Sequence, residues 1–417
     1  MPPSPADFRY AAAFKLMERS LQFGMAAAIL VIGTLFSLRL RDALHPTSVL
    51  CALWGALGMF YLLLPHSLRS ISLNTFVLIT CAVVAFAISS LCVVARPRAK
   101  IPSSWRSTAM RPLLFWTGVL GFPFFVVRAL QIAEATPVTD SFLINLRTAL
   151  TGDDGDLGAY GSLAYLIPIC FSSSFVELVV SRSRLFEWRG WISFGFAVSY
   201  AVLFTGRTLI FLLIIPLAVV LLVQRRVRLR SVILGTAALL ALAFFGIGLL
   251  LGKIGAGDED STFGAVDAMT IYLLGGIAAF DLVSLSPTPL EWGVNVLRSP
   301  LAVLHAFGID VPVALLIKDF VFVPEPTNVF TVLLPYFRDF GWAGVLSFFA
   351  LFGWLHALLY RSAKSQDPRA IILYAISMYP LLMQFFHDQY LSLLTTWVLF
   401  TMFVGLSFRP LRGRPLR

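Results

Sequence analysis

Three clusters of polar residues interrupt an otherwise apolar sequence and could carry chemistry. The first is Thr205-Gly206-Arg207-Thr208, which lies between two apolar runs of roughly 17 residues, or about 25 Å of helix rise each. Such a hairpin is slightly short for the hydrocarbon layer of a membrane, so we expect Arg207 to be partly desolvated and to need an anionic partner. Gly206 would let the chain turn tightly beside it. The alternative is an arginine that extends to lipid phosphates and only anchors the hairpin.

The second cluster lies in residues 324–341, shortly before another apolar run. Its polar side chains can bind hydroxyls and anionic oxygens. They are Asn328, Thr331, Tyr336, Arg338 and Asp339. The alternative is an interfacial belt, in which Tyr336 and Arg338 anchor a helix and Asp339 pairs with Arg338.

The third cluster is His387-Asp388-Gln389-Tyr390, between the last two apolar runs. A histidine beside an aspartate could act as a general base, although such a segment is more often an ordinary polar turn. The other histidines and the four cysteines show no metal-ligand spacing, and no nucleotide-binding or common hydrolase motif occurs. The sequence therefore predicts neither a metal nor another cofactor.

The elements that position these clusters are apolar helices. Of the 417 residues, 58% are hydrophobic and only 13% are charged, against about 25% in soluble domains. The apolar residues form blocks of roughly 17–22 residues, the length of a membrane-spanning helix. We therefore predict an all-α polytopic membrane protein with about eleven transmembrane helices. The predicted spans are 21–38, 46–65, 74–95, 112–132, 158–180, 190–205, 208–223, 231–252, 341–359, 370–386 and 390–408.

The connections alternate in charge and predict the topology. Most of the 32 Lys and Arg residues lie in short connections that the positive-inside rule places in the cytoplasm, so the net charge of +10 does not indicate nucleic-acid binding. These basic segments are 39–45, 96–111, 181–189, 224–230, 360–369 and the tail from 409. The acidic connections, 133–157 and the large loop 253–340, would face outward. In that loop, 271–280 and 312–323 fit helices that lie on the membrane or re-enter it.

The N-terminus does not fit the alternation. Eleven spans would place it outside, whereas Lys15 and Arg19 favour the cytoplasm. Either one early block does not span, or residues 1–20 lie on the outer membrane surface as an amphipathic helix. We expect residues 1–417 to form a single membrane domain.

Several segments taken in order resemble the O-antigen and oligosaccharide repeat-unit polymerase family, the Wzy polymerases. The similarity is clearest over about 190–360. The segments that carry it are Thr205-Gly206-Arg207-Thr208, Tyr272 with Gly275-Gly276-Ile277-Ala278-Ala279-Phe280-Asp281, Thr327-Asn328-Val329-Phe330-Thr331, and Tyr336 to Gly344.

The resemblance implies an inverting glycosyltransferase of the GT-C type in the bacterial inner membrane, with its active site facing the periplasm. Its substrates would be oligosaccharide repeat units on undecaprenyl pyrophosphate, and a chain-length regulator would be a candidate partner protein. Fixed cations would stabilise the pyrophosphate leaving group, and a base would take a proton from the attacking hydroxyl. Candidates for the pyrophosphate site are Arg207, Lys253, Arg298, Lys318 and Arg338; candidates for the base are Asp339, Asp281 and His387.

Two other functions fit parts of the sequence. An O-antigen ligase would share the lipid donor and the large external loop but would use lipid A core as its acceptor. A lipid-linked oligosaccharide flippase or other transporter belongs to a different class, and should show repeated halves and charged groups near the bilayer midplane. Here the polar residues gather at the predicted outer face, which favours surface chemistry over transport.

Overall fold

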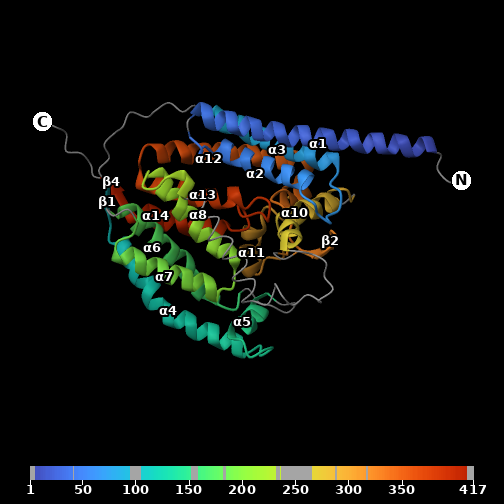
Figure 1. Cartoon of the computed structure of the whole chain (residues 1–417). Helices are drawn as coiled ribbons and strands as arrows, with labels where there is room; N and C mark the ends of the chain where they lie inside the picture. The colour runs from blue at the N-terminus through green and yellow to red at the C-terminus, as the bar shows by residue number, and fades with distance from the viewer. Residues whose placement is uncertain are drawn as a thin grey trace. The chain divides into compact units, whose positions relative to one another are not determined.

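The computed structural model describes residues 5–40, 42–93, 105–151, 158–181, 185–231, 235, 265–286, 289–315 and 318–410, and the protein is built almost entirely of α-helices (Figure 1). The helices are α1 (Pro5–Leu40), α2 (Pro46–Leu63), α3 (Leu73–Cys92), α4 (Met110–Glu134), α5 (Phe142–Thr151), α6 (Leu166–Val180), α7 (Trp188–Leu203), α8 (Arg207–Val223), α10 (Ala265–Ser284), α11 (Arg298–Ala306), α12 (Leu333–Lys364), α13 (Pro368–Leu382) and α14 (Leu394–Ser407), with a 3-10 helix η1 (Gly161–Tyr165) before α6. Two short antiparallel ribbons pair β1 (Trp105–Ser107) with β4 (Phe408–Pro410) and β2 (Val321–Phe322) with β3 (Pro326–Thr327).

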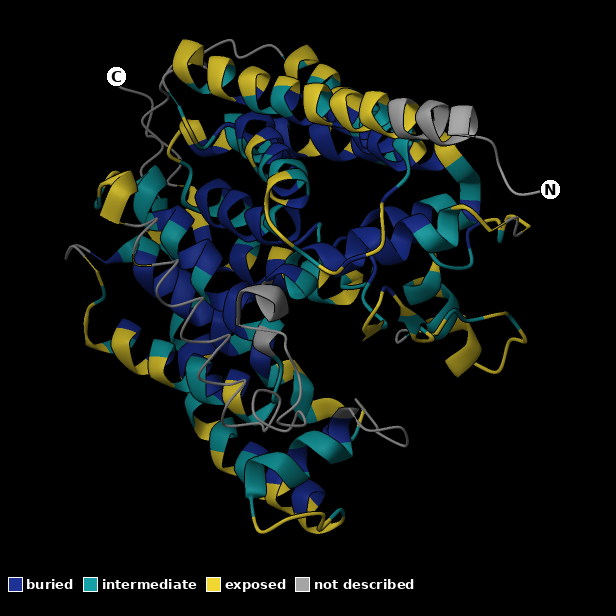
Figure 2. Ribbon diagram, turned by 45° about the vertical axis from the view of Figure 1, so that its right-hand side comes forward, coloured by how far each residue is buried: buried dark blue, intermediate teal, exposed yellow. Residues whose placement is uncertain are grey.

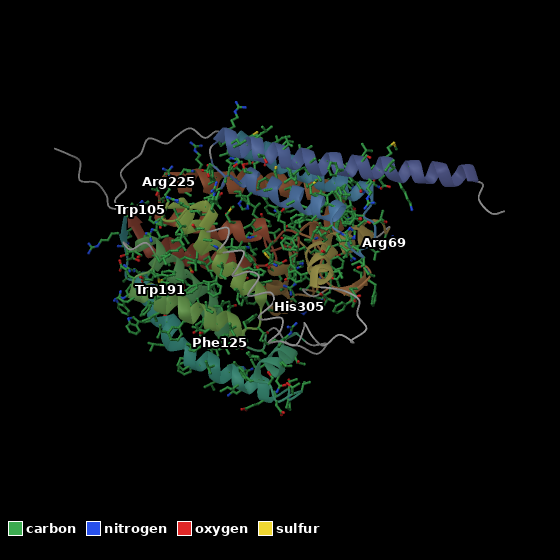
Figure 3. All side chains as sticks on the ribbon, viewed as in Figure 1. Arg69, Trp105, Phe125, Trp191, Arg225 and His305 are labelled. Atoms are coloured by element: carbon green, nitrogen blue, oxygen red, sulfur yellow. The ribbon has the colours of Figure 1, made fainter. Side chains whose placement is uncertain are left out.

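The chain forms two compact units whose segments alternate along the sequence. Unit 1 consists of Met1–Ala95, Thr262–Leu358 and Pro380–Leu394, and unit 2 of Arg96–Ser261, Leu359–Tyr379 and Thr395–Arg417. In unit 1, helices α1, α2 and α3 pack side by side (Figure 1). In unit 2, helices α4, α6, α7 and α8 pack on one another, and the ring of Phe125 on α4 stacks on Tyr160 (Figure 3).

The described helices confirm an all-α membrane protein. Six of them are long and apolar enough to cross a bilayer. Those six are Phe14–Leu40, Pro46–Leu63, Leu73–Cys92, Met110–Glu134, Gly161–Val180 and Leu333–Lys364. Every predicted span except 231–252 overlaps a helix, and 231–252 lies almost entirely outside the described residues.

The helices expose large apolar side chains, as a lipid-facing surface does. Leu35 on α1 is 59% exposed, and Phe124 on α4 is 68% exposed. Yellow, exposed turns run along much of α1 (Figure 2). An apolar surface of this extent is unfavourable in water but is stable against lipid tails. Since α1 continues without a break from Pro5 to Leu40, residues 5–20 belong to the same helix as the first predicted span.

The segment 253–340 is only partly helical. The predicted apolar stretch 271–280 lies within helix α10, but the described part of 312–323 forms no helix and contains strand β2. The expectation of a second short helix is therefore wrong for those residues. Pro312 and Pro324 bound a stretch rich in valine, which disfavours helix and favours extended chain.

Helix α12 begins eight residues before the predicted span and bends at its expected start. Gly341 has φ 60° and ψ −146°, a conformation that is essentially restricted to glycine. The bend separates a short helical segment, from Leu333 to Phe340, from the long apolar one. Arg338 and Asp339 therefore lie immediately before a sharp change of direction, where they face other parts of unit 1.

Candidate functional site

Asp339 fixes the loop that precedes α11. Its side chain is fully buried, and one carboxylate oxygen, Oδ1, accepts hydrogen bonds from the Asn295 side chain at 2.7 Å and the Asn295 backbone N–H at 3.2 Å. Its other oxygen accepts a bond from the backbone N–H of Val296 at 2.7 Å. A buried carboxylate with three donors is held in place and is poorly placed to receive a proton from a substrate. This geometry favours a structural role for Asp339 over the predicted role of general base.

Three cations gather around this loop. The ammonium group of Lys318 donates to Asn295 Oδ1 at 2.8 Å, and Arg298 donates through Nε to the carbonyl of Ala314 at 2.9 Å. Arg338 donates to Glu291 at 3.1 Å, and its buried Nε has no partner among the described residues. Arg338 pairs with Glu291, so the predicted interfacial pair between Arg338 and Asp339 is absent. The contacts leave several donors of these cations unused, as an anion-binding site requires.

The electrostatics of the cluster reflect its partial burial. Burial is the main reason that the pKa of Lys318 lies below its usual value; the carboxylates of Glu291 and Asp339 act against this shift, and repulsion from Arg338 and Arg298 adds to it. Burial also lowers the pKa of Arg298. For Glu291, burial acts in the opposite direction, but hydrogen bonds from Asn295 and Arg338 outweigh it and lower the pKa. The group therefore holds its charges at some energetic cost, which a bound anion would reduce.

His387 lies beside these cations. Burial lowers its pKa from the usual 6.5, and the positive charges of Lys318 and Arg298 lower it further, whereas Asp388 raises it. Its ring forms no hydrogen bond with another described residue. A neutral, half-buried imidazole near an anion-binding group is suited to accept a proton at neutral pH. Among the three predicted bases, His387 is the one whose acceptor atoms remain available.

Asp388 holds the turn that carries His387. One carboxylate oxygen accepts from the Tyr336 hydroxyl at 2.9 Å and from the backbone N–H of Tyr390 at 3.0 Å. The other accepts from the Leu391 and Ser392 backbone N–H groups and the Ser392 hydroxyl. Asp388 forms no hydrogen bond with the neighbouring imidazole, so the pair is not a His-Asp catalytic dyad. Tyr336, predicted to bind substrate, is fully buried and orients Asp388.

Helix α10 packs closely against the same turn. A Cβ atom on Gly276 would come within 2.8 Å of the Phe385 carbonyl oxygen, so only glycine permits this approach. Nearby, the ring of Tyr272 packs on Phe386 with centroids 5.5 Å apart. Gly276, the second glycine of the segment Gly275-Gly276, thus lies against the backbone that precedes His387.

Asp281 connects the end of α10 to the start of α3. Its Oδ1 accepts hydrogen bonds from the Ser72 backbone N–H at 3.0 Å, the Ser72 hydroxyl, and the Thr75 hydroxyl at 2.7 Å. The side chain is only 1% exposed. These contacts give Asp281 a clear structural role, and leave it less suited than His387 to act as a base.

A buried chain of polar side chains lies behind the turn. Trp54 donates its indole N–H to Gln384 at 2.8 Å, and the Gln384 amide donates to the Tyr390 hydroxyl at 3.2 Å. Tyr390 lies 3.0 Å from Nε2 of His356. Either Tyr390 or His356 can be the donor of this bond, because the role of the ring nitrogen depends on the histidine tautomer. The chain fixes α2, α12 and the segment around His387 relative to one another.

The remaining predicted residues are placed as follows. Thr331 is fully buried and its hydroxyl accepts from the Leu333 backbone N–H at the start of α12, and Asn328 is half-buried nearby. Arg207 is the first residue of α8, in unit 2, and its side chain lies outside the described part of the structure. Lys253 also lies outside the described residues. The described contacts therefore bring together Arg298, Lys318, Arg338, Asp339 and His387 within unit 1.

The expected role of Gly206 is wrong. Gly206 has φ −93° and ψ 108°, which any residue adopts, and a Cβ atom there would make only ordinary contacts of 3.7 Å or more. Its neighbour Thr205 takes the left-handed conformation, with φ 54°. The tight turn before Arg207 is therefore made by a threonine, whose buried hydroxyl has no partner among the described residues.

Sequence reasoning missed Glu291, Asn295 and Gln384 as parts of this region. Glu291 and Asn295 are four residues apart and hydrogen bond to each other at 2.6 Å, a spacing that could have drawn attention to them. Gln384 lies inside an apolar run and carries no local signal. Among the described residues, no group of three or more His, Cys, Asp or Glu side chains could hold a metal ion.

Comparisons with protein-family models, with curated proteins and with solved structures found no match for this chain.

Proposed function

We propose that this protein is an inner-membrane polysaccharide polymerase that transfers an undecaprenyl-pyrophosphate-linked glycan onto the next lipid-linked repeat unit at the periplasmic face. One observation carries the proposal: three half-buried cations with unused donors lie beside an unpaired, neutral histidine in unit 1. A pyrophosphate leaving group needs fixed positive charge, and a hydroxyl acceptor needs a base. The finer topology of about eleven spans, the GT-C architecture and the outward-facing loop are part of the same proposal.

In this mechanism, Arg298, Lys318 and Arg338 bind the pyrophosphate of the donor. The acceptor hydroxyl loses its proton to the free nitrogen of His387 and attacks the anomeric carbon from the opposite side. The new glycosidic bond forms as the bond to the pyrophosphate oxygen breaks, so the anomeric configuration inverts. The lipid pyrophosphate leaves with one additional negative charge, which the three cations stabilise. Because the activated donor supplies the energy, the reaction needs no nucleotide.

The direct test uses the purified full chain with a synthetic lipid-linked repeat unit and follows the ladder of extended products. We expect Arg298→Gln and Lys318→Gln each to lower the rate by about 10²–10³, as does the loss of one preorganised donor at a developing negative charge. Arg69→Gln, which removes an exposed charge elsewhere in unit 1, is the matched control and should keep wild-type activity. Full activity of both cluster variants at normal protein level would contradict the assignment.

The choice between polymerase and ligase depends on the acceptor. In a strain that lacks this gene, lipopolysaccharide carrying a single repeat unit would indicate a polymerase, and complete loss of attached polysaccharide would indicate a ligase. A transporter would form no glycosidic bond in the purified system. Arg207 is kept as a second candidate for the donor pyrophosphate, on the resemblance and its place at the start of α8.

A further inference from the structure

Unit 2 contains a polar cavity of about 580 Å³ at the ends of several of its helices. Its walls come from segments near the start of α4, the end of α6, the start of α7, the end of α8, the start of α13 and the β1–β4 ribbon, and they include one acidic side chain, Glu187. The volume is within the range of small-molecule sites. The charge pattern predicts that these segments are cytoplasmic, and the cavity belongs to unit 2, whereas the proposed transferase residues belong to unit 1.

Two buried polar atoms in the wall have no partner among the described residues. One is the indole nitrogen of Trp105, a donor, and the other is the side-chain oxygen of Gln224, an acceptor. The Gln224 amide nitrogen donates to the carbonyl of Val179 at 3.3 Å, which fixes the orientation of the amide. Buried polar groups are nearly always hydrogen bonded, so an unpaired donor and an unpaired acceptor on residues that line one cavity favour a ligand that offers both. Each atom has almost no accessible surface, so a small shift of its side chain must bring it to the ligand.

Arginines supply positive charge at the same place. Arg106 lines the cavity and lies directly opposite Arg409 in the β1–β4 ribbon, an arrangement of like charges that is unfavourable unless an anion is nearby. Arg111 also lines the cavity; it binds Glu177 through Nε and one terminal nitrogen, which leaves its other terminal nitrogen available. The guanidinium of Arg369 lies 4.1 Å over the Trp105 ring (Figure 3 labels Trp105) and holds it in position.

From these groups we infer that the cavity binds a glycerol phosphate group, either as the headgroup of an anionic phospholipid or as a free glycerol phosphate. The phosphate oxygens accept hydrogen bonds from Trp105 Nε1 and from Arg106. A glycerol hydroxyl donates to the Gln224 oxygen. Basic pockets between helix ends on the cytoplasmic side are the usual place for lipid headgroups of this charge.

The inference is tested by native mass spectrometry of the full chain in neutral detergent. The added ligands are phosphatidylglycerol, phosphatidylcholine and sn-glycerol 3-phosphate. We expect saturable binding of phosphatidylglycerol, and a dissociation constant about tenfold higher in Trp105→Phe and Arg106→Gln, as for one lost charge-assisted hydrogen bond. Trp105→Phe keeps an aromatic ring beneath Arg369. Arg409→Gln removes the same charge from the opposite strand but does not line the cavity, and should change the constant by less than about threefold.

Comparing phosphatidylglycerol with sn-glycerol 3-phosphate shows whether the bound group is a lipid headgroup or a free glycerol phosphate. Binding of phosphatidylglycerol alone identifies a lipid site, and equal binding of glycerol phosphate identifies a soluble ligand; both support the inference. Equal affinity for phosphatidylcholine, or an equal loss in Arg409→Gln and Arg106→Gln, would overturn it. Melting temperatures show whether each variant is folded. If Trp105→Phe is unstable, the exposed Arg106→Gln variant decides the matter alone.

Discussion

Gly276 of α10 and the backbone carbonyl of Phe385 are in direct contact, with no room for a side chain between them. The contact joins a helix of the large loop to the turn that carries His387, two residues further along the chain. It makes the position of the imidazole depend on the absence of a single methyl group. This dependence can be tested with neighbouring glycines of the same helix.

Gly276→Ala should therefore displace the turn. We expect a loss of about 1–3 kcal/mol in the free energy of unfolding, as for overpacking of a close contact, together with a loss of polymerase activity. Gly275→Ala is the matched control, because its new methyl group would meet only Ile271 at 3.8 Å. Thermal unfolding in detergent and the product ladder should be measured for both variants. Equal behaviour of the two would show that the contact with Phe385 does not position the site.

The pH dependence of the reaction should report His387. The base must be neutral to act, and the pKa of His387 is lowered from 6.5, chiefly by burial. The rate should therefore be flat from about pH 8 to pH 6.5 and fall only below 6.5, as the imidazole becomes protonated. His387→Gln should abolish this acidic limb along with most of the activity. The exposed His305 is the control, and His305→Gln should leave the profile unchanged. An acidic limb centred above pH 6.5 would exclude His387 as the base.

The Asp339→Asn variant tests whether Asp339 has a structural role or acts as the general base. The substituted amide would direct an N–H toward the backbone N–H of Val296, which now donates to the carboxylate. We expect a loss of about 2 kcal/mol in stability, in the range for hydrogen bonds to buried charged groups, and a lower protein level in the membrane. Activity per folded molecule should fall far less than in His387→Gln. If Asp339→Asn is stable but has no polymerase activity, Asp339 is the general base after all, and the structural assignment is wrong.

Gly206→Ala should fold normally. The backbone at this position is accessible to any residue, and the nearest atoms to the new methyl group lie 3.7 Å away. The free energy of unfolding should change by less than about 0.5 kcal/mol, which a denaturation curve can verify. A marked loss of stability would show that the turn before Arg207 needs glycine after all. A loss of activity at full stability would support close approach of the donor to this turn.

The charge alternation predicts the membrane topology. A reporter fused after Arg226 or Lys364 should read cytoplasmic, and one fused near Asp260 should read periplasmic, because basic residues are retained on the cytoplasmic side. Expression level of each fusion is the internal control. A periplasmic reading at Lys364 would reverse the assigned orientation of the second half of the chain.

The helices could be predicted from sequence because membrane-length apolar blocks are a local property. The start of α12 could not, because Leu333 to Phe340 is a short polar-flanked stretch that only the glycine at 341 separates from the long helix. The role of Asp388 could have been predicted from the sequence, because its carboxylate accepts hydrogen bonds from backbone N–H groups only two to four residues ahead.

The roles of Asp339 and Arg338 were not predictable in the same way. Asp339 is next to an arginine in sequence, yet its partners are Asn295 and Val296, more than forty residues earlier. Arg338 turns to Glu291 instead, at a similar separation along the chain. Adjacent residues on a helix point about 100° apart, so neighbours in sequence are poor candidates for a pair. Only the fold shows which distant segment each one meets.

The hydrogen bond between Trp54 and Gln384 joins residues that are 330 positions apart. During synthesis, helix α2 enters the bilayer long before Gln384 has been translated. The indole N–H of Trp54 therefore lacks this acceptor until most of the chain has been made. A ribosome that stalls before residue 384 leaves a polar group unpaired among lipid tails. In unit 1, a finished chain therefore has a buried hydrogen bond that an unfinished chain lacks.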